Sequence, residues 1–173
     1  MALVPPLDAS PDEVRALLAP LRGDFSIALH AFQNAFAVGA IVRVAHSFLA
    51  REIFVVGDAP YYEKASMGME KYETVVRVKD DAELFERVRG RPVWAIEKDD
   101  ARRSLYAVER FPRDVVFLFG SERAGLPVDV IARADDVIGI PMYGVNHSFP
   151  VAVAAGIVMN EWARQRYVEG LTL

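Results

Sequence analysis

The sequence predicts an α/β fold in which a mostly parallel β-sheet is flanked by helices. Short apolar runs alternate along the chain with segments whose apolar residues recur at helical spacing. Most runs are apolar at consecutive positions, which is typical of strands covered on both faces, and such strands occur in parallel sheets. The chain has 173 residues, of which 53% are hydrophobic, and it shows no linker or internal repeat. We therefore predict a single domain over residues 1–173.

Six apolar runs are predicted to be strands. Each is short, as expected of a strand buried within a sheet. They cover residues 25–30, 52–57, 74–78, 92–97, 114–120 and 136–141. Ligands of open parallel sheets bind at the carboxyl ends of the strands. The loops that follow Glu97, Gly120 and Pro141 are therefore where we expect a functional site.

The segments between the strands predict helices. Ser10 suits an N-cap, Pro11 the first helical position and Glu13 the reciprocal position of a capping box, so a short N-terminal helix is expected over residues 10–22. Apolar spacing and capping residues predict further helices over residues 38–50, 81–89, 127–134 and 149–167. The stretches 59–72 and 98–113 are expected to be connectors.

Composition argues against several classes of protein. Cysteine is absent, so no disulfide or thiolate site forms, which agrees with a cytoplasmic location. No secretory leader is expected, and no apolar run approaches the roughly 18 residues that span a bilayer. The formal net charge of -4 argues against an overall basic surface for nucleic acid, although a local basic patch is compatible with it.

Common nucleotide-binding and metal-binding motifs are missing. The sequence has no GxxxxGK[ST] motif and no GxGxxG after the first predicted strand. His30, His46 and His147 lack the spacing of metal ligands, so we interpret each as a surface or hydrogen-bonded residue and predict no metal.

Three other stretches carry residues suited to chemistry, and each also has a structural explanation. Arg43, near the apolar face of its helix, is either a snorkelling or ion-paired side chain or a fixed cation for an anion such as phosphate. Glu122, in "GSERAGLP", is either a capping or salt-bridged residue or a group that faces a ligand at the end of a strand. Ser148, in "IPMYGVNHSFP", is a plausible N-cap of the last helix, and Pro150 lies near its first turn, where proline is tolerated.

In this order, the three stretches resemble the motifs of a known family. The sequence is similar to the SpoU/TrmH-type RNA 2'-O-ribose methyltransferases of the SPOUT superfamily. The resemblance rests on Arg43 in an early helix, on Gly-Ser-Glu-x-x-Gly-Leu after a late strand, and on Ile-Pro-Met-x-Gly followed by Ser148 before a helix rich in small residues. The resemblance covers about residues 25–166. The second and third motifs are specific in combination, whereas the first is weak alone.

The resemblance implies a fold, a reaction and partners. Members of the family have a C-terminal trefoil knot, bind S-adenosyl-L-methionine in its loops and typically form homodimers with the active site at the subunit interface. By resemblance, this chain transfers a methyl group to a ribose 2'-hydroxyl of tRNA or rRNA. Only about 24 residues precede the first predicted strand, so we expect no separate RNA-binding domain.

The resemblance also implies roles for individual residues. The implied catalytic residues are Arg43, Glu122 and Ser148. Because arginine is effectively always charged, we expect Arg43 to orient the target phosphate and stabilise a developing alkoxide rather than to take a proton. The implied cofactor-binding residues are Ala95, Glu97, Leu118, Gly120, Ile140, Met142, Ser148 and Phe149. The implied substrate-binding residues are Asn34, Arg43 and Arg123.

Basic side chains near these loops have two explanations, a local RNA-binding patch or a solvated charged face. They are Lys98, Arg102, Arg103, Arg110, Arg113 and Arg123.

Two of the motifs depart from the family pattern, at three positions. Ala37 stands where the family usually has the asparagine of Asn-x-Gly-x-Ile-x-Arg, although Asn34 is close by. Pro150 and Ala152 replace the asparagine and second serine of Ser-Leu-Asn-x-Ser. Two alternatives to an active enzyme therefore stay open: a catalytically silent RNA-binding or cofactor-binding relative, and an unrelated α/β nucleotide-binding module.

Overall fold

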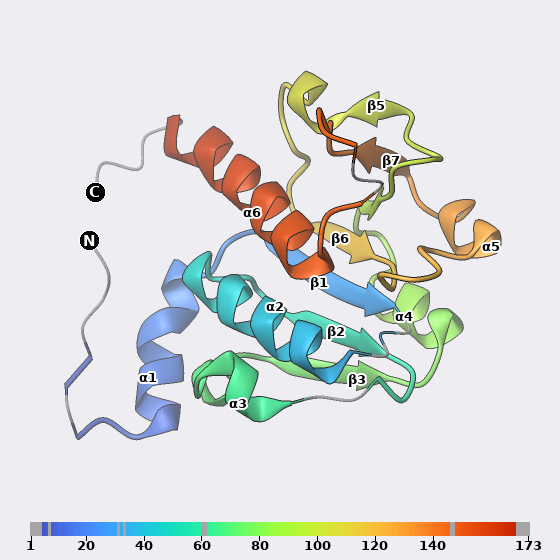
Figure 1. Ribbon diagram of the computed structural model, residues 1–173. Helices are drawn as coiled ribbons and strands as arrows, with labels where there is room; N and C mark the ends of the chain where they lie inside the picture. Colours follow the sequence, from blue (N-terminus) through green and yellow to red (C-terminus); the bar gives the residue numbers. More distant parts are fainter. Residues whose placement is uncertain are drawn as a thin grey trace.

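A seven-stranded sheet lies at the centre of the computed structural model, which describes residues 5–6, 8–30, 32, 34–59, 62–145 and 148–168 (Figure 1). The strands lie in the order β3-β2-β1-β6-β4-β7-β5, and every described pair of strands is parallel. They are β1 (Phe25–His30), β2 (Ile53–Val56), β3 (Val75–Val78), β4 (Val93–Ile96), β5 (Arg103–Ser104), β6 (Val115–Phe119) and β7 (Asp136–Gly139). The predicted fold class and its six strands are confirmed. Strand β5 was not expected, because two residues are too few to give a pattern.

The five predicted helices are present, together with shorter ones inside the two stretches expected to be connectors. The α-helices are α1 (Pro11–Leu18), α2 (Ala35–Ser47), α3 (Glu63–Ser66), α4 (Asp81–Arg87), α5 (Val128–Ile131) and α6 (Val151–Val168). The 3-10 helices are η1 (Ala19–Leu21), η2 (Met69–Lys71) and η3 (Leu105–Ala107).

Side-chain caps explain where two of the helices begin. At α1 the backbone N–H of Ser10 donates to the Glu13 carboxylate at 2.7 Å and the Glu13 N–H donates to Ser10 Oγ at 3.3 Å, which confirms the capping box. Donation by the backbone N–H and then the hydroxyl of Ser10 lowers the pKa of Glu13 below its ordinary value. At α2 the Asn34 Oδ1 accepts from the N–H groups of Phe36 and Ala37, so this helix begins at Ala35, three residues before the predicted start.

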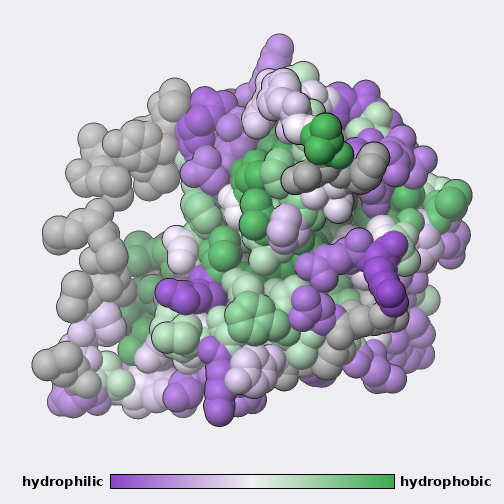
Figure 2. All heavy atoms as spheres, viewed as in Figure 1, coloured by the Kyte–Doolittle hydropathy of each residue, from purple (hydrophilic) through white to green (hydrophobic). Residues whose placement is uncertain are grey.

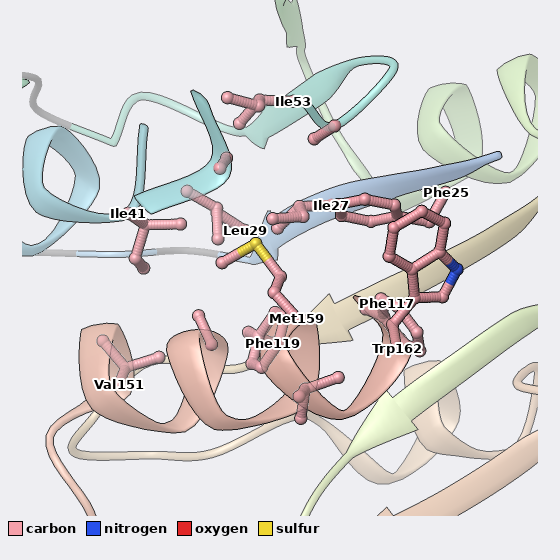
Figure 3. Close-up of a cluster of buried hydrophobic side chains, with 14 of the residues drawn as sticks. Phe25, Ile27, Leu29, Ile41, Ile53, Phe117, Phe119, Val151, Met159 and Trp162 are labelled. Atoms are coloured by element: carbon pink, nitrogen blue, oxygen red, sulfur yellow. The ribbon is translucent and has the colours of Figure 1, made fainter. Parts of the chain in front are cut away.

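Helices α2 and α6 cover one face of the sheet, and α4 and α5 cover the other (Figure 1). On the first face, Met159 of α6 extends toward β1 and the Trp162 ring packs on Phe25 with 4.3 Å between ring centroids (Figure 3). Phe117 of β6 lies beside the same cluster and is fully buried. On the second face, smaller strand residues such as Ala95 and Leu118 pack with side chains of α4 and α5. Both faces of the sheet are therefore buried, which explains why the strand sequences are continuous apolar runs.

The histidines that the structure describes have structural partners. The His46 Nδ1 lies 2.7 Å from Oε1 of the buried Glu73, and the His30 Nε2 lies 3.0 Å from the Asp81 Oδ1. His147 lies outside the described residues. No group of three or more acidic or histidine side chains in the described ranges could hold a metal ion. Among the same residues, no helix is both long and apolar enough to cross a membrane.

Replacement of Phe117 by alanine tests the assignment of the core. The ring is fully buried against Phe25 and Phe111, so Phe117→Ala should lower the free energy of unfolding by about 3–5 kcal/mol in urea denaturation. Tyr106→Ala is the control, because this ring is 61% exposed and its loss should change the same quantity by less than about 0.5 kcal/mol. Equal losses in the two variants would contradict the core assignment.

Candidate functional site

A cavity of about 350 Å³ opens where β4, β6 and β7 end. Its wall is formed by residues 96–100 after β4, residues 119–126 after β6, and residues between 140 and 154 that lead from β7 into α6. The three loops indicated by the sequence meet here because the carboxyl ends of parallel strands share one edge of the sheet. The volume lies within the range of small-molecule sites in proteins.

Two glycine backbones cross closely in the loop after β6. A Cβ atom added to Gly120 would lie 2.3 Å from the carbonyl carbon of Gly125. Gly125 has a φ of +64°, and a Cβ there would lie 2.7 Å from Oε2 of Glu97. Both positions therefore require glycine, one for close approach and the other for close approach and a left-handed conformation.

The Glu97 carboxylate lies against this crossing and binds backbone on both sides. Its Oε2 accepts from the Leu126 N–H at 3.2 Å, and its Oε1 accepts from the Lys98 N–H at 2.8 Å. Glu97 therefore joins the end of β4 to the loop after β6, across 29 residues of sequence.

Six of the eight implied cofactor-binding residues line the cavity: Glu97, Gly120, Ile140, Met142, Ser148 and Phe149. Ala95 and Leu118 do not line it, because they are fully buried on the face covered by α4 and α5. Their chain neighbours Ile96 and Phe119, which pair in register on the other face, line it instead. Successive residues of a strand point to opposite faces, so an error of one residue changes the face.

The position of Ser148 differs from the sequence interpretation. Helix α6 begins at Val151, and the Pro150 carbonyl accepts from the N–H groups of Val153 and Ala154 at 2.9 and 3.0 Å. Pro150 therefore occupies the N-cap position, since the carbonyl of that residue accepts the first helical hydrogen bond. The N-cap interpretation of Ser148 is wrong, and Ser148 lies in the cavity wall. Sequence reasoning missed Val151 and Ala154 of α6, which line the cavity three residues apart, on one side of the helix.

Glu122 and Arg123 also line the cavity, and Arg43 does not. The Asn34 Nδ2 donates to Oε2 of Glu122 at 3.4 Å, so the first turn of α2 reaches the cavity. Arg43 follows Asn34 by nine residues, or about 13 Å along the helix axis, and its side chain is exposed. Among the described residues, the Arg43 guanidinium has no hydrogen bond or ion pair, so the ion-paired explanation finds no support.

The charged groups of the wall are mostly acidic. The carboxylates are those of Glu97, Asp99, Asp100 and Glu122, and the cations are Lys98 and Arg123. Lys98 Nζ lies 3.3 Å from Asp99 Oδ1, and this carboxylate offsets part of the positive charge of Lys98. The cavity therefore favours a ligand with positive charge over an anion.

The basic residues around the cavity do not form one free patch. Arg103 pairs with Asp136 and lies 4.8 Å from the centre of the Trp94 ring, and Arg113 lies 3.6 Å from Asp24.

A second cavity of about 420 Å³ shares Lys98, Ile140 and Met142 with the first and is also lined by Arg103.

The chain is similar to three known proteins. The tRNA (guanosine(18)-2'-O)-methyltransferase of Thermus thermophilus is 29% identical over 164 residues, which cover 91% of this chain and 84% of the relative. The solved structure of the A. aeolicus TrmH/SpoU tRNA modifying enzyme has a TM-score of 0.80 and 25% identity, covering 92% of this chain and 84% of the other. The SpoU methyltransferase AviRb from Streptomyces viridochromogenes, solved in complex with the cofactor AdoMet, has a TM-score of 0.73 and 26% identity. The match covers 84% of this chain and 59% of the other.

A family model matches most of the same range. The sequence model of the SpoU rRNA Methylase family matches residues 24–160, a range that contains α2, the loop with Gly120 and Gly125, and the segment from β7 into α6. The matched range covers most of the chain and includes the strands β4, β6 and β7, at whose ends the cavity opens. The chain therefore belongs to the SpoU rRNA methylase family.

Proposed function

We propose that this chain transfers a methyl group from S-adenosyl-L-methionine to a ribose 2'-hydroxyl of tRNA or rRNA. The observation that carries the proposal is the cavity in which the loops after β6 and β7, bearing the family's second and third motifs, form one wall. The relatives named above act on tRNA or are described as SpoU methyltransferases, and one of them was solved with AdoMet.

The lining of the cavity fits this cofactor. Ile96, Phe119, Ile140 and Phe149 provide an apolar wall suited to a purine ring, and Gly120 lets the backbone come close to a ligand. The carboxylates that also line the cavity suit the positively charged sulfonium and ammonium groups. When bound, the cofactor supplies a methyl group that the sulfonium charge already activates.

The residues of the chain then have to position a weak nucleophile. A ribose hydroxyl reacts when it is held in line with the methyl group, and fixed geometry of this kind can lower a barrier by several kcal/mol, about 7–11 at the limit. Glu122 and Ser148, both in the cavity wall, can accept hydrogen bonds from the incoming ribose. An arginine that binds the target phosphate and stabilises the developing alkoxide completes the arrangement.

A second copy of the chain supplies that arginine in this proposal. Arg43 is exposed on α2 and outside the cavity of its own chain. Phe36, seven residues before it on the same side of α2, is 62% exposed, and Val153 of α6 is 46% exposed. Figure 2 shows the face of the molecule that carries α2 and α6, with hydrophobic residues over much of its middle and hydrophilic residues nearer its edges. A homodimer formed through α2 and α6 would cover these side chains and bring Arg43 of one copy to the cavity of the other.

The trefoil knot, the cytoplasmic location, and recognition of RNA without a separate domain stay predictions. The segment that enters α6 includes residues 146 and 147, which lie outside the described residues.

A silent relative is the second candidate, and one feature of α6 favours it. Pro150 at the N-cap position has no side-chain donor or acceptor, so it cannot orient a substrate as an asparagine can. This candidate binds RNA or S-adenosylhomocysteine without methyl transfer.

Cofactor binding is the first measurement. Calorimetric titration with S-adenosylhomocysteine should show one site per chain. Absence of binding would remove the active enzyme and a silent relative that binds the cofactor, and would leave a silent relative that binds RNA alone, since the family match removes the unrelated nucleotide-binding module.

Methyl transfer tests the reaction and the role of Arg43. Incubation with labelled cofactor and total RNA should label the RNA, and Arg43→Ala should reduce the rate by about 100-fold or more without weakening binding of S-adenosylhomocysteine. Arg87→Ala is the matched control, since Arg87 is exposed on α4 and pairs only with Glu83 among the described residues. Binding without transfer to any RNA pool would support the silent candidate.

Complementation tests whether Arg43 acts across subunits. Co-expression of Arg43→Ala with Glu122→Ala chains should restore about a quarter of the activity, because half of the dimers are mixed and each mixed dimer has one intact site. If Arg43 acts within its own chain, no mixed dimer has an intact site and activity stays absent.

A further inference from the structure

We propose that Glu97 and Asn34 are positioning residues that hold the loop 120–126 from two sides and thereby place Glu122 at the cavity. The inference deepens the proposed function and rests on it. It changes the role that the family resemblance implied for Glu97, from direct contact with the cofactor to support of the loop that forms the cavity wall.

The loop has few contacts of its own that could fix its position. Within it, the Gly125 N–H donates to the Ser121 carbonyl at 2.9 Å and the Ala124 N–H donates to the Ser121 Oγ at 3.3 Å. These bonds define a tight turn. The buried Leu126 side chain anchors the end of the loop in the core on the side of α4 and α5, and polar side chains from outside the loop hold the remainder.

Glu97 holds the loop from the side of β4. Each of its carboxylate oxygens accepts from a backbone N–H, that of Leu126 at the end of the loop and that of Lys98. Hydrogen bonds from amides to an ionised carboxylate are among the stronger ones in proteins. The missing Cβ of Gly125 provides the space in which the carboxylate sits, since that atom would lie 2.7 Å from Oε2.

Asn34 holds the loop from the side of α2. Its Oδ1 accepts from the N–H groups of Phe36 and Ala37, so the amide is oriented by the helix it caps. With the oxygen turned to the helix, Nδ2 faces outward and donates to Glu122 Oε2 at 3.4 Å. Among the usual N-cap side chains, only the carboxamide of asparagine has its acceptor and its donor on separate atoms, one for the cap and one for a carboxylate. Ala37 cannot make this contact, because it is buried and has only a methyl group.

Glu97→Gln tests the first contact without loss of size. The substitution replaces one acceptor oxygen by an NH₂ group, which cannot accept from a backbone N–H. We expect the affinity for S-adenosylhomocysteine to fall about tenfold, as for the loss of one hydrogen bond to a charged group, and hydrogen exchange of the Leu126 amide to become faster. Glu83→Gln is the matched control. Glu83 lies on α4, outside the cavity wall, and its carboxylate also accepts from a backbone N–H, that of Lys79 at 2.9 Å. It should change neither quantity.

A glycine pair gives a second test of the same contact. Gly125→Ala places a methyl group against Glu97, and should speed exchange at Leu126 and weaken cofactor binding. Gly57→Ala has a similar positive φ of +74° but no heavy atom within 4 Å of the added Cβ, so it controls for backbone strain.

Asn34→Asp and Asn34→Ser test the second contact. Both side chains can cap α2. Aspartate has no donor for Glu122, and the serine hydroxyl, which is bonded directly to Cβ, lacks the reach of the asparagine Nδ2. We expect kcat for methyl transfer to fall about tenfold in both variants, with the melting temperature and the affinity for S-adenosylhomocysteine retained. A loss confined to the melting temperature would show Asn34 to be a helix cap only.

The outcomes separate this inference from the proposed function. Wild-type affinity in Glu97→Gln together with unchanged exchange at Leu126 would overturn the role of Glu97. Weakened binding with unchanged exchange would also overturn it, because Glu97 would then contact the ligand itself. If the unmodified chain binds no S-adenosylhomocysteine, the proposed function fails, whereas the exchange rate at Leu126 still tests whether Glu97 holds the loop.

Discussion

The crossing of the Gly120 and Gly125 backbones, with the Glu97 carboxylate against it, is the constraint on which the site depends. No side chain larger than hydrogen fits at either glycine, and the loop between them carries Glu122 and Arg123 into the cavity wall. The hydrogen bond from the Leu126 N–H to Glu97 joins this loop to the end of β4. Two strands that neighbour one another in the sheet are therefore also joined beyond it, and the cavity forms between their loops.

The sheet supplies the rigid base for that arrangement. Large aromatic residues pack with α2 and α6 on one face, and smaller residues pack with α4 and α5 on the other. The cavity belongs to the first face, since Ile96, Phe119 and Ala154 contribute to that core or pack on it, and also line the cavity. Packing of α6 onto the sheet and formation of this part of the cavity wall thus use the same residues, so this part is fixed by the core.

Within one chain, the arginine that is proposed to bind the phosphate of the RNA does not line the cavity. The cavity wall is mostly acidic, which suits a sulfonium group, and Arg43 is exposed on another part of α2. Supplied by a second copy, it would meet the RNA at the rim and make activity depend on assembly.

The sequence by itself determined six of the strands, the positions of five helices and the edge of the sheet where the site lies, because these follow from hydrophobic periodicity, capping residues and the geometry of parallel strands. Only the tertiary structure decided which side of each strand faces the cavity, so that Ile96 and Phe119 line it and Ala95 and Leu118 do not. A run that is apolar at every position has no periodicity that marks a face. The same holds for Asn34 with Glu122, 88 residues apart, and Glu97 with Leu126: such contacts depend on which loops the strand order brings together, and no local pattern in the chain records that order.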